Sequence, residues 1–416
     1  MKIYLNGMDH VAAGLADACR FTPGGSNHFM LALVLDGVPE AARLTALPEA
    51  LPPEVRRMLT GRPRRGWDLA PYWAPGGIEP VPLDETDASD VTAGLEQFGD
   101  LPLPAGQALA LRLARLPENR SFLLWKFSHR IFDGLGAELL VQSVLRGRMA
   151  DYAAPGMADA ELRHWGDKMR AGREVNRALR TCATAPLMRY PAGPARRGRA
   201  RFLLRSVALE PLRERAEREA GAMMFGCFVM GTAAHVAAEF LFRKGSGGGM
   251  LVMPVSLDLR KRGARHPELF GNQWGMLPLA WRYDAMRDAA DWIRAAKLQT
   301  AAALGSGLPG AFAKANLLMR ILPERAMACL SQRCFQGRAG SLMFSLLAQS
   351  EIPEEALGCR VENFFHAPTM PPDPAFGLFL NCRQDRLNLT ASWRDGAVPD
   401  EEMARLLDGL CRALEA

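Results

Sequence analysis

The sequence predicts an α/β protein of two domains, each built from layers of strands and helices. Its 416 residues exceed what one ordinary hydrophobic core holds. Short apolar runs typical of strands alternate with longer helical patterns along the whole chain. Between 185 and 200 the composition shifts to proline, glycine and arginine, which indicates a connector. We therefore expect an N-terminal half over 1–185, a connector over 186–200 and a C-terminal half over 201–416.

The elements of the first half follow from local pattern. An apolar run after the turn signal Pro23-Gly24-Gly25 predicts a buried strand over 26–36. A helical pattern broken by Pro52-Pro53 follows, and then a segment rich in Pro, Gly and Asp that predicts irregular loops with short strands. In order we expect the strand 26–36, helix 40–59, loops and short strands 62–104, strands 108–113 and 121–127 joined by a turn at 117–119, helix 135–145 and an arginine-rich helical region 159–181.

The same alternation restarts after the connector. A glycine-rich loop at 245–249 runs from a helix to a strand, the reverse of the order in Rossmann and P-loop sites, so it predicts a flexible turn and no phosphate site. In order we expect strand 202–207, helices 211–220 and 224–242, strand 250–257, helices 287–304 and 311–322, strands 341–347, 377–381 and 386–393, and helix 400–414.

Composition narrows the functional classes. Hydrophobic residues make up 49% of the chain, which predicts a globular protein. The eight cysteines include no Cys-x-x-Cys pair, which disfavours a disulfide framework or a zinc site and fits a reducing cytoplasm. The segment 1–7 has no apolar core of a signal peptide, and no stretch approaches the length of a membrane span. We expect a cytoplasmic protein without a membrane span.

The net charge of +6 leaves two interpretations of the one dense basic run, 196–201. The run lies in the connector without interleaved aromatic residues, so nucleic acid is not an expected partner. It is either a solvated linker, which we favour, or a surface that attracts a phosphate-bearing acyl carrier. The seven histidines are dispersed with no His-Glu-x-x-His pattern, which predicts no metal site, and no Gly-x-Ser-x-Gly elbow is present.

The most informative string is Ser-His-Arg-Ile-Phe-Asp-Gly at 128–134. It follows an apolar run and precedes an amphipathic stretch, so it predicts a loop between a strand and a helix. A histidine on such a loop, His129, can accept a proton from a substrate near neutral pH. Asp133 lies four positions further on, and Gly134 permits backbone geometries closed to other residues.

A second landmark lies about 120 residues further on. Residues 254–262 read Pro-Val-Ser-Leu-Asp-Leu-Arg-Lys-Arg, and residues 270–278 read Phe-Gly-Asn-Gln-Trp-Gly-Met-Leu-Pro. Together with His-x-x-x-Asp-Gly, this string resembles the signature of the chloramphenicol acetyltransferase-like superfamily. The members of that superfamily include condensation domains, BAHD acyltransferases and polyketide-associated acyltransferases. The C-terminal strands and helix also resemble the end of these proteins.

The resemblance implies two similarly built α/β halves that form a pseudo-dimer, with a solvent channel at their interface entered from opposite faces by donor and acceptor. On that template His129 is the catalytic base, and Asp133 points away from substrate and pairs with Arg260, which together with Gly134 supports the loop. The implied function is transfer of an acyl group from a thioester of coenzyme A or a phosphopantetheinyl carrier protein to a hydroxyl or amine. No bound cofactor is implied.

Further candidates for the channel or for oxyanion stabilisation are Ser128, Asn272, Gln349, Ser350 and His28. The sequence departs from the superfamily pattern in places. Ser128 stands where condensation domains usually carry a first histidine, and 348–351 replaces a late Ser-Asn-Leu-Gly-like loop. These departures keep open an alternative from another class, a catalytically degenerate binding or scaffolding protein of the same fold.

Overall fold

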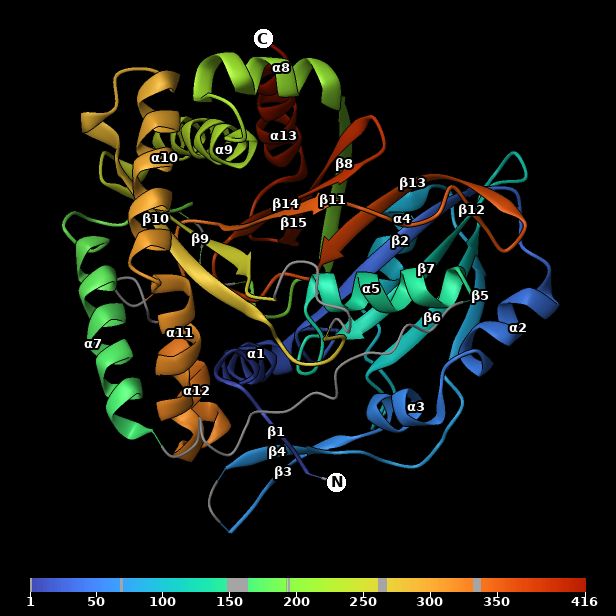
Figure 1. The fold of residues 1–416 in the computed structure, drawn as a ribbon. Helices are drawn as coiled ribbons and strands as arrows, with labels where there is room; N and C mark the ends of the chain where they lie inside the picture. Colours follow the sequence, from blue (N-terminus) through green and yellow to red (C-terminus); the bar gives the residue numbers. More distant parts are fainter. Residues whose placement is uncertain are drawn as a thin grey trace.

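The computed structural model describes residues 2–67, 70–147, 164–191, 193, 195–260, 268–331 and 338–416. Figure 1 shows two layered regions side by side, each a sheet with helices packed on it. Both large sheets have six strands, in the orders β12-β13-β2-β7-β6-β5 and β10-β9-β11-β14-β15-β8, and a three-stranded sheet has the order β1-β4-β3. The expected fold of two α/β halves is confirmed.

The first sheet is covered on both faces. Alternate residues of its central strand point in opposite directions: Leu31 and Leu33 pack in one core with the helix α5, whereas Ala32 and Val34 pack in another with α4. Because both faces are buried, the strand reads as a continuous apolar run. The elements of this region are β2 (His28–Asp36), β5 (Leu83–Asp87), β6 (Leu109–Arg115), β7 (Ser121–Ser128), β12 (Glu355–Ala356), β13 (Cys359–Pro368), α2 (Ala41–Glu49), α3 (Pro53–Leu59), α4 (Val91–Gly99) and α5 (Gly134–Leu145).

The second sheet packs against long helices on the side away from the first. Its strands are β8 (Ala200–Ala208), β9 (Met250–Asp258), β10 (Trp274–Arg282), β11 (Met343–Gln349), β14 (Phe376–Arg383) and β15 (Arg386–Arg394). The helices of this region are α7 (Trp165–Thr181), α8 (Leu209–Ala220), α9 (Phe225–Leu241), α10 (Ala289–Gly305), α11 (Leu308–Asn316), α12 (Glu324–Ser331) and α13 (Asp400–Glu415), with short turns η2 (Phe242–Ser246), η3 (Tyr283–Ala285) and η4 (Leu317–Ile321).

One helical stretch in the described ranges, Phe225–Ser246, is long and apolar enough to cross a membrane. However, 61% of its apolar window is buried. The α9 part of this stretch contacts α8, α10, α13 and β9. Burial in the core of the second half therefore accounts for its composition.

The two regions exchange elements. Strands β12 and β13 come late in the chain but complete the first sheet, where β13 pairs antiparallel with β2 and Phe364 lies opposite Leu33. Conversely, α1 (Gly7–Ala18) comes first in the chain and packs against α11 and α12 of the second region. The boundaries at 185 and 200 stay a prediction. The strands β12 and β13 and the helix α1 each pack with the region on the other side of these boundaries.

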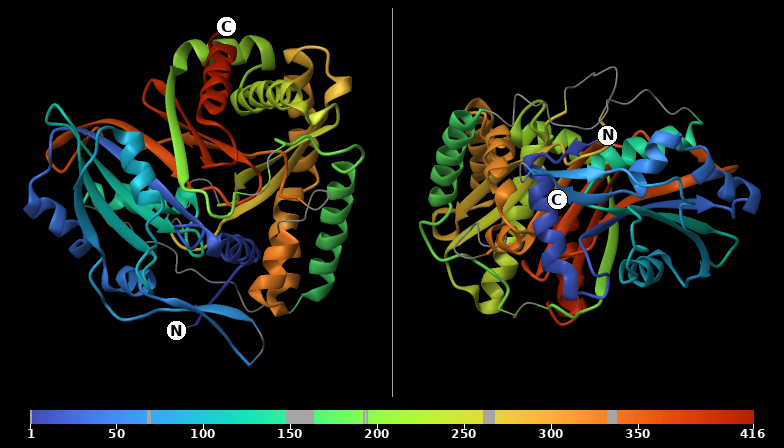
Figure 2. Two further views of the ribbon diagram at one scale, coloured as in Figure 1. Left: turned by 180° about the vertical axis from the view of Figure 1, so that it is seen from behind. Right: turned by 90° about the horizontal axis from the view of Figure 1, so that it is seen from below.

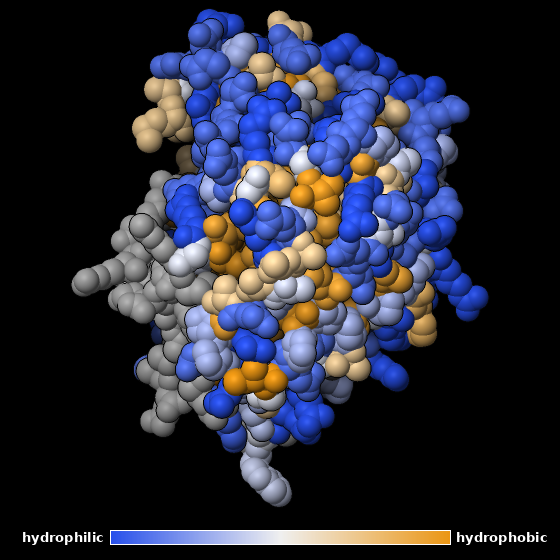
Figure 3. Space-filling model, turned by 90° about the vertical axis from the view of Figure 1, so that its right-hand side faces the viewer, coloured by the Kyte–Doolittle hydropathy of each residue, from blue (hydrophilic) through white to orange (hydrophobic). Residues whose placement is uncertain are grey.

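A small sheet lies below the junction of the two regions and projects from the molecule (Figures 1 and 2). It consists of β1 (Ile3–Tyr4), β4 (Pro71–Ala74) and β3 (Arg62–Arg65), and the short turn η1 (Cys19–Phe21) follows α1. The guanidinium of Arg65 donates hydrogen bonds to the carbonyls of Arg320 and Leu322, which ties this sheet to the second region. The surface on the first region's side mixes hydrophobic and hydrophilic side chains across its middle (Figure 3).

Most expected elements are confirmed within a few residues, and several were missed. The structure adds α1, β1, α4, β10, α12, β12 and β13. The expected helical region begins at Trp165, and its first residues, 159–163, lie outside the described residues. The segment 311–322 is not one helix, because α11 ends at Asn316 and a tighter turn follows.

Candidate active site

The His-x-x-x-Asp-Gly loop connects β7, which ends at Ser128, to α5, which begins at Gly134. The backbone N–H of His129 donates to the carbonyl of Asn27 at 3.2 Å. His129 as a whole residue is half-buried, and its imidazole packs edge-on against Phe29, with ring centroids 5.2 Å apart. The loop thus holds a histidine at the end of a fully buried strand, with part of its surface open to solvent.

Asp133 and Arg260 form the ion pair that the sequence predicted. Both terminal nitrogens of Arg260 lie 3.0 Å from the Asp133 carboxylate, and the two side chains are only 8% and 7% exposed. Asp133 also caps α5 by accepting from the N–H of Gly136 at 2.7 Å, and it accepts from the N–H of Gln273 at 2.8 Å. One carboxylate therefore fixes the start of α5 to two segments of the second region.

Electrostatics favour the charged form of Arg260. Burial lowers the pKa of its guanidinium, but the charges of and hydrogen bonds to Asp133 and Asp258 outweigh burial and raise that pKa above its ordinary value. Within the second region, the Arg260 side chain donates to the carbonyl of Glu268 at 2.8 Å. Across the junction, the N–H of Gly271 donates to the carbonyl of Ile131 at 2.7 Å. The loop that carries His129 is therefore held rigidly by the second region.

The expected backbone role of glycine belongs to Gly136 rather than Gly134. Gly134 is the first residue of α5, its φ is not positive, and a Cβ there would meet only ordinary contacts, the nearest being Nδ1 of His366 at 3.5 Å. A Cβ at Gly136 would lie 2.3 Å from the carbonyl oxygen of Leu269 and 2.9 Å from a terminal nitrogen of Arg260. The close approach of the second region therefore requires glycine at 136.

Asn272 sets the tautomer of His129. Its Nδ2 donates to the carbonyl of His129 and to Oδ1 of Asp9, both at 2.9 Å, so its Oδ1 is the acceptor. That Oδ1 lies 3.2 Å from Nε1 of Trp274, which donates, and 3.0 Å from Nδ1 of His129. Nδ1 of His129 must then carry the proton, which leaves the lone pair on Nε2. Asn272, expected to line the channel or to stabilise the oxyanion, orients the imidazole of His129.

Burial tunes the two ionisable groups of this network in opposite directions. It lowers the pKa of His129 below its ordinary value, an effect that the charge of Asp133 partly offsets. Burial raises the pKa of Asp9 to about 6, against hydrogen bonds from Asn272 and Asn6. At neutral pH His129 is therefore uncharged and able to accept a proton.

Ser128 and His28 lie beside each other in the first sheet, as partners in the β2–β7 ladder. Both are buried, and the backbone N–H of Ser128 donates to the carbonyl of Ala108 at 2.9 Å. Burial and the positive charge of Lys126 hold the pKa of His28 well below its ordinary range. Condensation domains usually carry a first histidine at the position of Ser128. No contact shown for Ser128 or His28 gives either residue the role of a second base.

Gln349 and Ser350 do not bond to the loop of His129. Gln349 is exposed. Its Oε1 accepts a hydrogen bond from the guanidinium of Arg213, and its Nε2 donates to the carbonyl of Gln384, both at 3.3 Å. Ser350 is buried, and its hydroxyl is bonded to Glu138 on α5. These contacts give no support to their expected role as oxyanion donors.

Sequence reasoning missed a histidine–carboxylate pair that joins α5 to β13. Nε2 of His366, on β13, lies 2.9 Å from the carboxylate of Glu138, and both side chains are about 95% buried. Burial alone would raise the pKa of Glu138, but hydrogen bonds from His366, Ser350 and Gln142 hold it below its ordinary value. The pair fastens the late strand β13 to the helix that follows His129. His366 lies 228 residues after Glu138 in the chain, so no local sequence pattern indicated that the two side chains pair.

Sequence reasoning also missed Asp9, which lies on α1 and holds Asn272 in place. The only signal was the string Asn6-Gly-Met-Asp9, a capping box in which Asn6 and Asp9 bond to each other's backbone. Within the described ranges, no group of three or more His, Cys, Asp or Glu side chains is placed to hold a metal ion. A neutral imidazole held in this way is able to accept a proton at Nε2.

Comparison with known proteins gives similarity of fold without recognisable similarity of sequence. No family model and no curated protein matches the chain. Among solved structures, the first condensation domain of the CDA synthetase aligns over 100% of this chain and 96% of its own, with a TM-score of 0.70 at 18% identity. A trichothecene 15-O-acetyltransferase from Fusarium sporotrichioides aligns over 99% and 94%, with a TM-score of 0.71 at 12% identity.

A mutant of the starter condensation domain of the rhizomide synthetase RzmA, in complex with C8-CoA, aligns over 100% of this chain and 94% of its own. Its TM-score is 0.67 at 13% identity. The likeness extends over the whole chain, so it covers both sheets and their junction. The protein therefore shares its fold with these condensation-domain and acetyltransferase structures.

Proposed function

We propose that this protein is an acyltransferase that moves an acyl group from a thioester to a hydroxyl or amine, with His129 as general base. The single observation that carries the proposal is the fixed tautomer of His129. Asn272 accepts from Nδ1, so Nε2 keeps its lone pair on a half-buried residue at the junction of the two regions. The low pKa of His129 keeps that lone pair available at neutral pH.

The proposed reaction is direct transfer. Nε2 of His129 takes the proton of the acceptor O–H or N–H while the acceptor oxygen or nitrogen attacks the thioester carbonyl. The new C–O or C–N bond forms, the C–S bond breaks, and the imidazolium returns the proton to the leaving thiolate. The neighbouring negative charge of Asp133 favours that transient imidazolium. No acyl-enzyme is required, because the two substrates meet beside one base.

The donor is an acyl thioester of coenzyme A or of a phosphopantetheinyl carrier protein. The similar RzmA domain was solved with C8-CoA, which supports this class of donor. The channel through which donor and acceptor meet at the junction is part of the proposal, as is a cytoplasmic location.

The test is consumption of a thioester by the purified protein. Octanoyl-CoA is incubated with a mixture of primary amines and alcohols, and free thiol and acylated products are measured by mass spectrometry. His129→Ala should reduce turnover about 10²- to 10⁴-fold, as expected for loss of a general base. The matched control is His164→Ala, a change at an exposed histidine, which should leave turnover unchanged. Equal turnover in His129→Ala and wild type would contradict the proposal.

The second candidate is a binding or scaffolding protein that keeps the fold without the reaction. The observation in its favour is that the late loop supplies no oxyanion donor from Gln349 or Ser350. This candidate predicts thioester binding without thiol release. A wild-type protein that binds octanoyl-CoA but releases no thiol with any acceptor would support it.

A further inference from the structure

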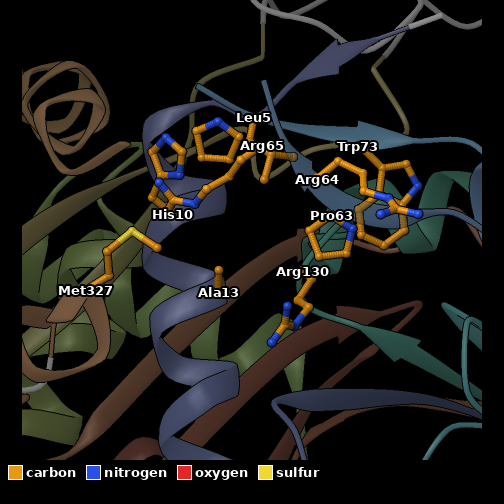
Figure 4. Close-up of a pocket in the computed structure, with 10 residues that line it drawn as sticks. Leu5, His10, Ala13, Pro63, Arg64, Arg65, Trp73, Arg130 and Met327 are labelled. Atoms are coloured by element: carbon orange, nitrogen blue, oxygen red, sulfur yellow. The ribbon is translucent and has the colours of Figure 1, made fainter. Parts of the chain in front are cut away.

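A small pocket lies next to the loop of His129, among α1, the β3–β4 ribbon and α12. Its volume is about 100 Å³. The residues that matter here are His10 on α1, Arg64 and Arg65 on β3, Trp73 on β4, Arg130 on the loop after β7 and Met327 on α12 (Figure 4). Elements from both regions therefore form its wall, and Arg130 directly follows His129 in the chain.

His10 is a buried polar side chain without a partner in the described part of the chain. It is 1% exposed, and neither ring nitrogen has a hydrogen-bond partner there. Leaving such a group unpaired is costly, because it has lost its bonds to water. Its ring lines the pocket, so a ligand in the pocket could restore a hydrogen bond.

The charges around His10 are positive. Burial, together with the positive charges of Arg65 and Arg320, lowers the pKa of His10 to about 4. At neutral pH the ring is therefore uncharged and offers one N–H donor. Figure 4 shows the Arg65 side chain extending toward His10, with Arg64 on the Trp73 side and Arg130 at another edge. The cationic edge selects a negatively charged group.

The rest of the wall is apolar, with Leu5, Ala13, Trp73 and Met327 among the lining residues. A volume near 100 Å³ is several times the roughly 10–15 Å³ of cavity volume that one water molecule needs, so the pocket holds a group of a few heavy atoms. A nucleotide is too large for this space. An organic acid fits the combination, because its carboxylate suits guanidinium groups and its hydrocarbon part suits the apolar wall.

We propose that this pocket binds a carboxylate of the acyl acceptor, so that the substrate class is a hydroxy or amino acid with an apolar body. This inference rests on the proposed function, and it adds the group that places the acceptor. The same two elements serve both sites: α1 contributes Asp9 to the support of the base and His10 to the pocket, and the loop contributes His129 and Arg130. An acceptor held in the pocket by its carboxylate therefore lies beside the loop that carries the proposed base.

The first experiment measures binding without catalysis. Hexanoate is titrated into the full-length protein, and the imidazole signals of His10 are followed by NMR, assigned with His10→Gln. We expect saturable shifts with hexanoate and none with 1-hexanol. Arg64→Gln should weaken hexanoate binding roughly 10-fold or more, as expected for a lost hydrogen bond between charged groups, and Arg64→Lys should retain part of it. Arg64 is exposed, so folding is not at risk.

The control is Arg62→Gln, which removes an exposed charge on the same strand outside the pocket and should bind hexanoate as wild type does. Equal shifts with 1-hexanol, or no shift with hexanoate, would overturn the proposal. Inorganic phosphate and coenzyme A are titrated as competitors. Displacement of hexanoate by phosphate with higher affinity would overturn the carboxylate assignment and place a phosphate of the donor in the pocket.

The second experiment compares acceptors. With octanoyl-CoA as donor, 6-hydroxyhexanoate should be acylated with a lower KM than 1-hexanol, and Arg64→Gln should raise the KM for the acid alone. Equal KM values for both acceptors would overturn the proposal while leaving acyl transfer intact. Hexanoate binding that depends on Arg64, without thiol release from any acceptor, would instead contradict the proposed function and leave an organic-acid site.

Discussion

Asp133→Ala should lower both the free energy of unfolding and the turnover, because the Asp133 carboxylate accepts four hydrogen bonds. Two come from Arg260 at 3.0 Å, one from the N–H of Gly136 at 2.7 Å and one from the N–H of Gln273 at 2.8 Å. With both partners less than a tenth exposed, removal of one leaves a buried charge poorly compensated. Such a loss typically costs about 3 to 5 kcal/mol.

Part of that cost is offset because Arg260 keeps Asp258 and the carbonyl of Glu268 as partners. We therefore expect the lower end of the range, about 3 kcal/mol, which includes the lost helix cap of about 1 kcal/mol. Urea unfolding followed by circular dichroism measures it. The matched control is Asp258→Ala: it removes another carboxylate from the same guanidinium, but Asp258 is 39% exposed and its loss should cost less than about 1 kcal/mol.

The double variant Asp133→Ala with Arg260→Met separates the pair from the cap. If the two side chains act as a pair, the double variant is much less destabilised than the sum of the single variants. Turnover of Asp133→Ala should fall because the loop of His129 loses its anchor. A folded Asp133→Ala protein with wild-type stability and wild-type turnover would refute the role of this pair.

Three further predictions follow from the site. The acid limb of the pH–rate profile should have its midpoint below 6.5, because burial lowers the pKa of His129, and a midpoint above 6.5 would contradict this. Gly136→Ala should destabilise by about 1 to 3 kcal/mol through overpacking, whereas Gly134→Ala should be neutral or slightly stabilising, and thermal unfolding of the two distinguishes them. The folded pKa of Glu138 lies below its ordinary value, so Glu138 contributes stability above about pH 4.5 that is lost as pH falls through the folded pKa. Urea unfolding free energies measured at pH values from about 5 to 3 should therefore fall less steeply in Glu138→Gln than in wild type, and an unchanged slope would contradict this.

Local pattern was sufficient wherever an element buries its own residues along one continuous stretch. The apolar run of β2 and the helical pattern of α9 are examples, and both halves of the fold follow from such runs. The missed strand β13 reads Cys-Arg-Val-Glu-Asn-Phe-Phe-His-Ala-Pro, with a bulge between Val361 and Asn363 that breaks the alternation of buried and exposed residues. Its pairing with β2, more than 300 residues earlier, depends on tertiary contacts that no local window contains.

The candidate site divides in the same way. His129, Asp133 and Arg260 were found because they lie in recognisable strings, and the structure brings Asp133 and Arg260 together. Asp9 and His366 were missed because their partners lie 263 and 228 residues away in the chain. Gln349 and Ser350 were predicted as oxyanion donors because they lie in 348–351, which replaces the superfamily's late loop. The register of β11 shifts between Leu347 and Gln349, and Gln349 is exposed.

The orientation of the base is a property of the assembled junction rather than of its loop. The loop supplies His129, but the acceptor for its Nδ1 proton is Asn272 of the second region, and Asp9 of α1 holds that amide. Because α1 packs on helices of the second region while β13 completes the first sheet, separating the regions would break the two exchanges and the network together. If His129 is the base that we propose, its tautomer depends on both regions, so we expect turnover only when they are docked. That dependence links stability of the junction to turnover, and it explains why the ion pair between Asp133 and Arg260 should govern both.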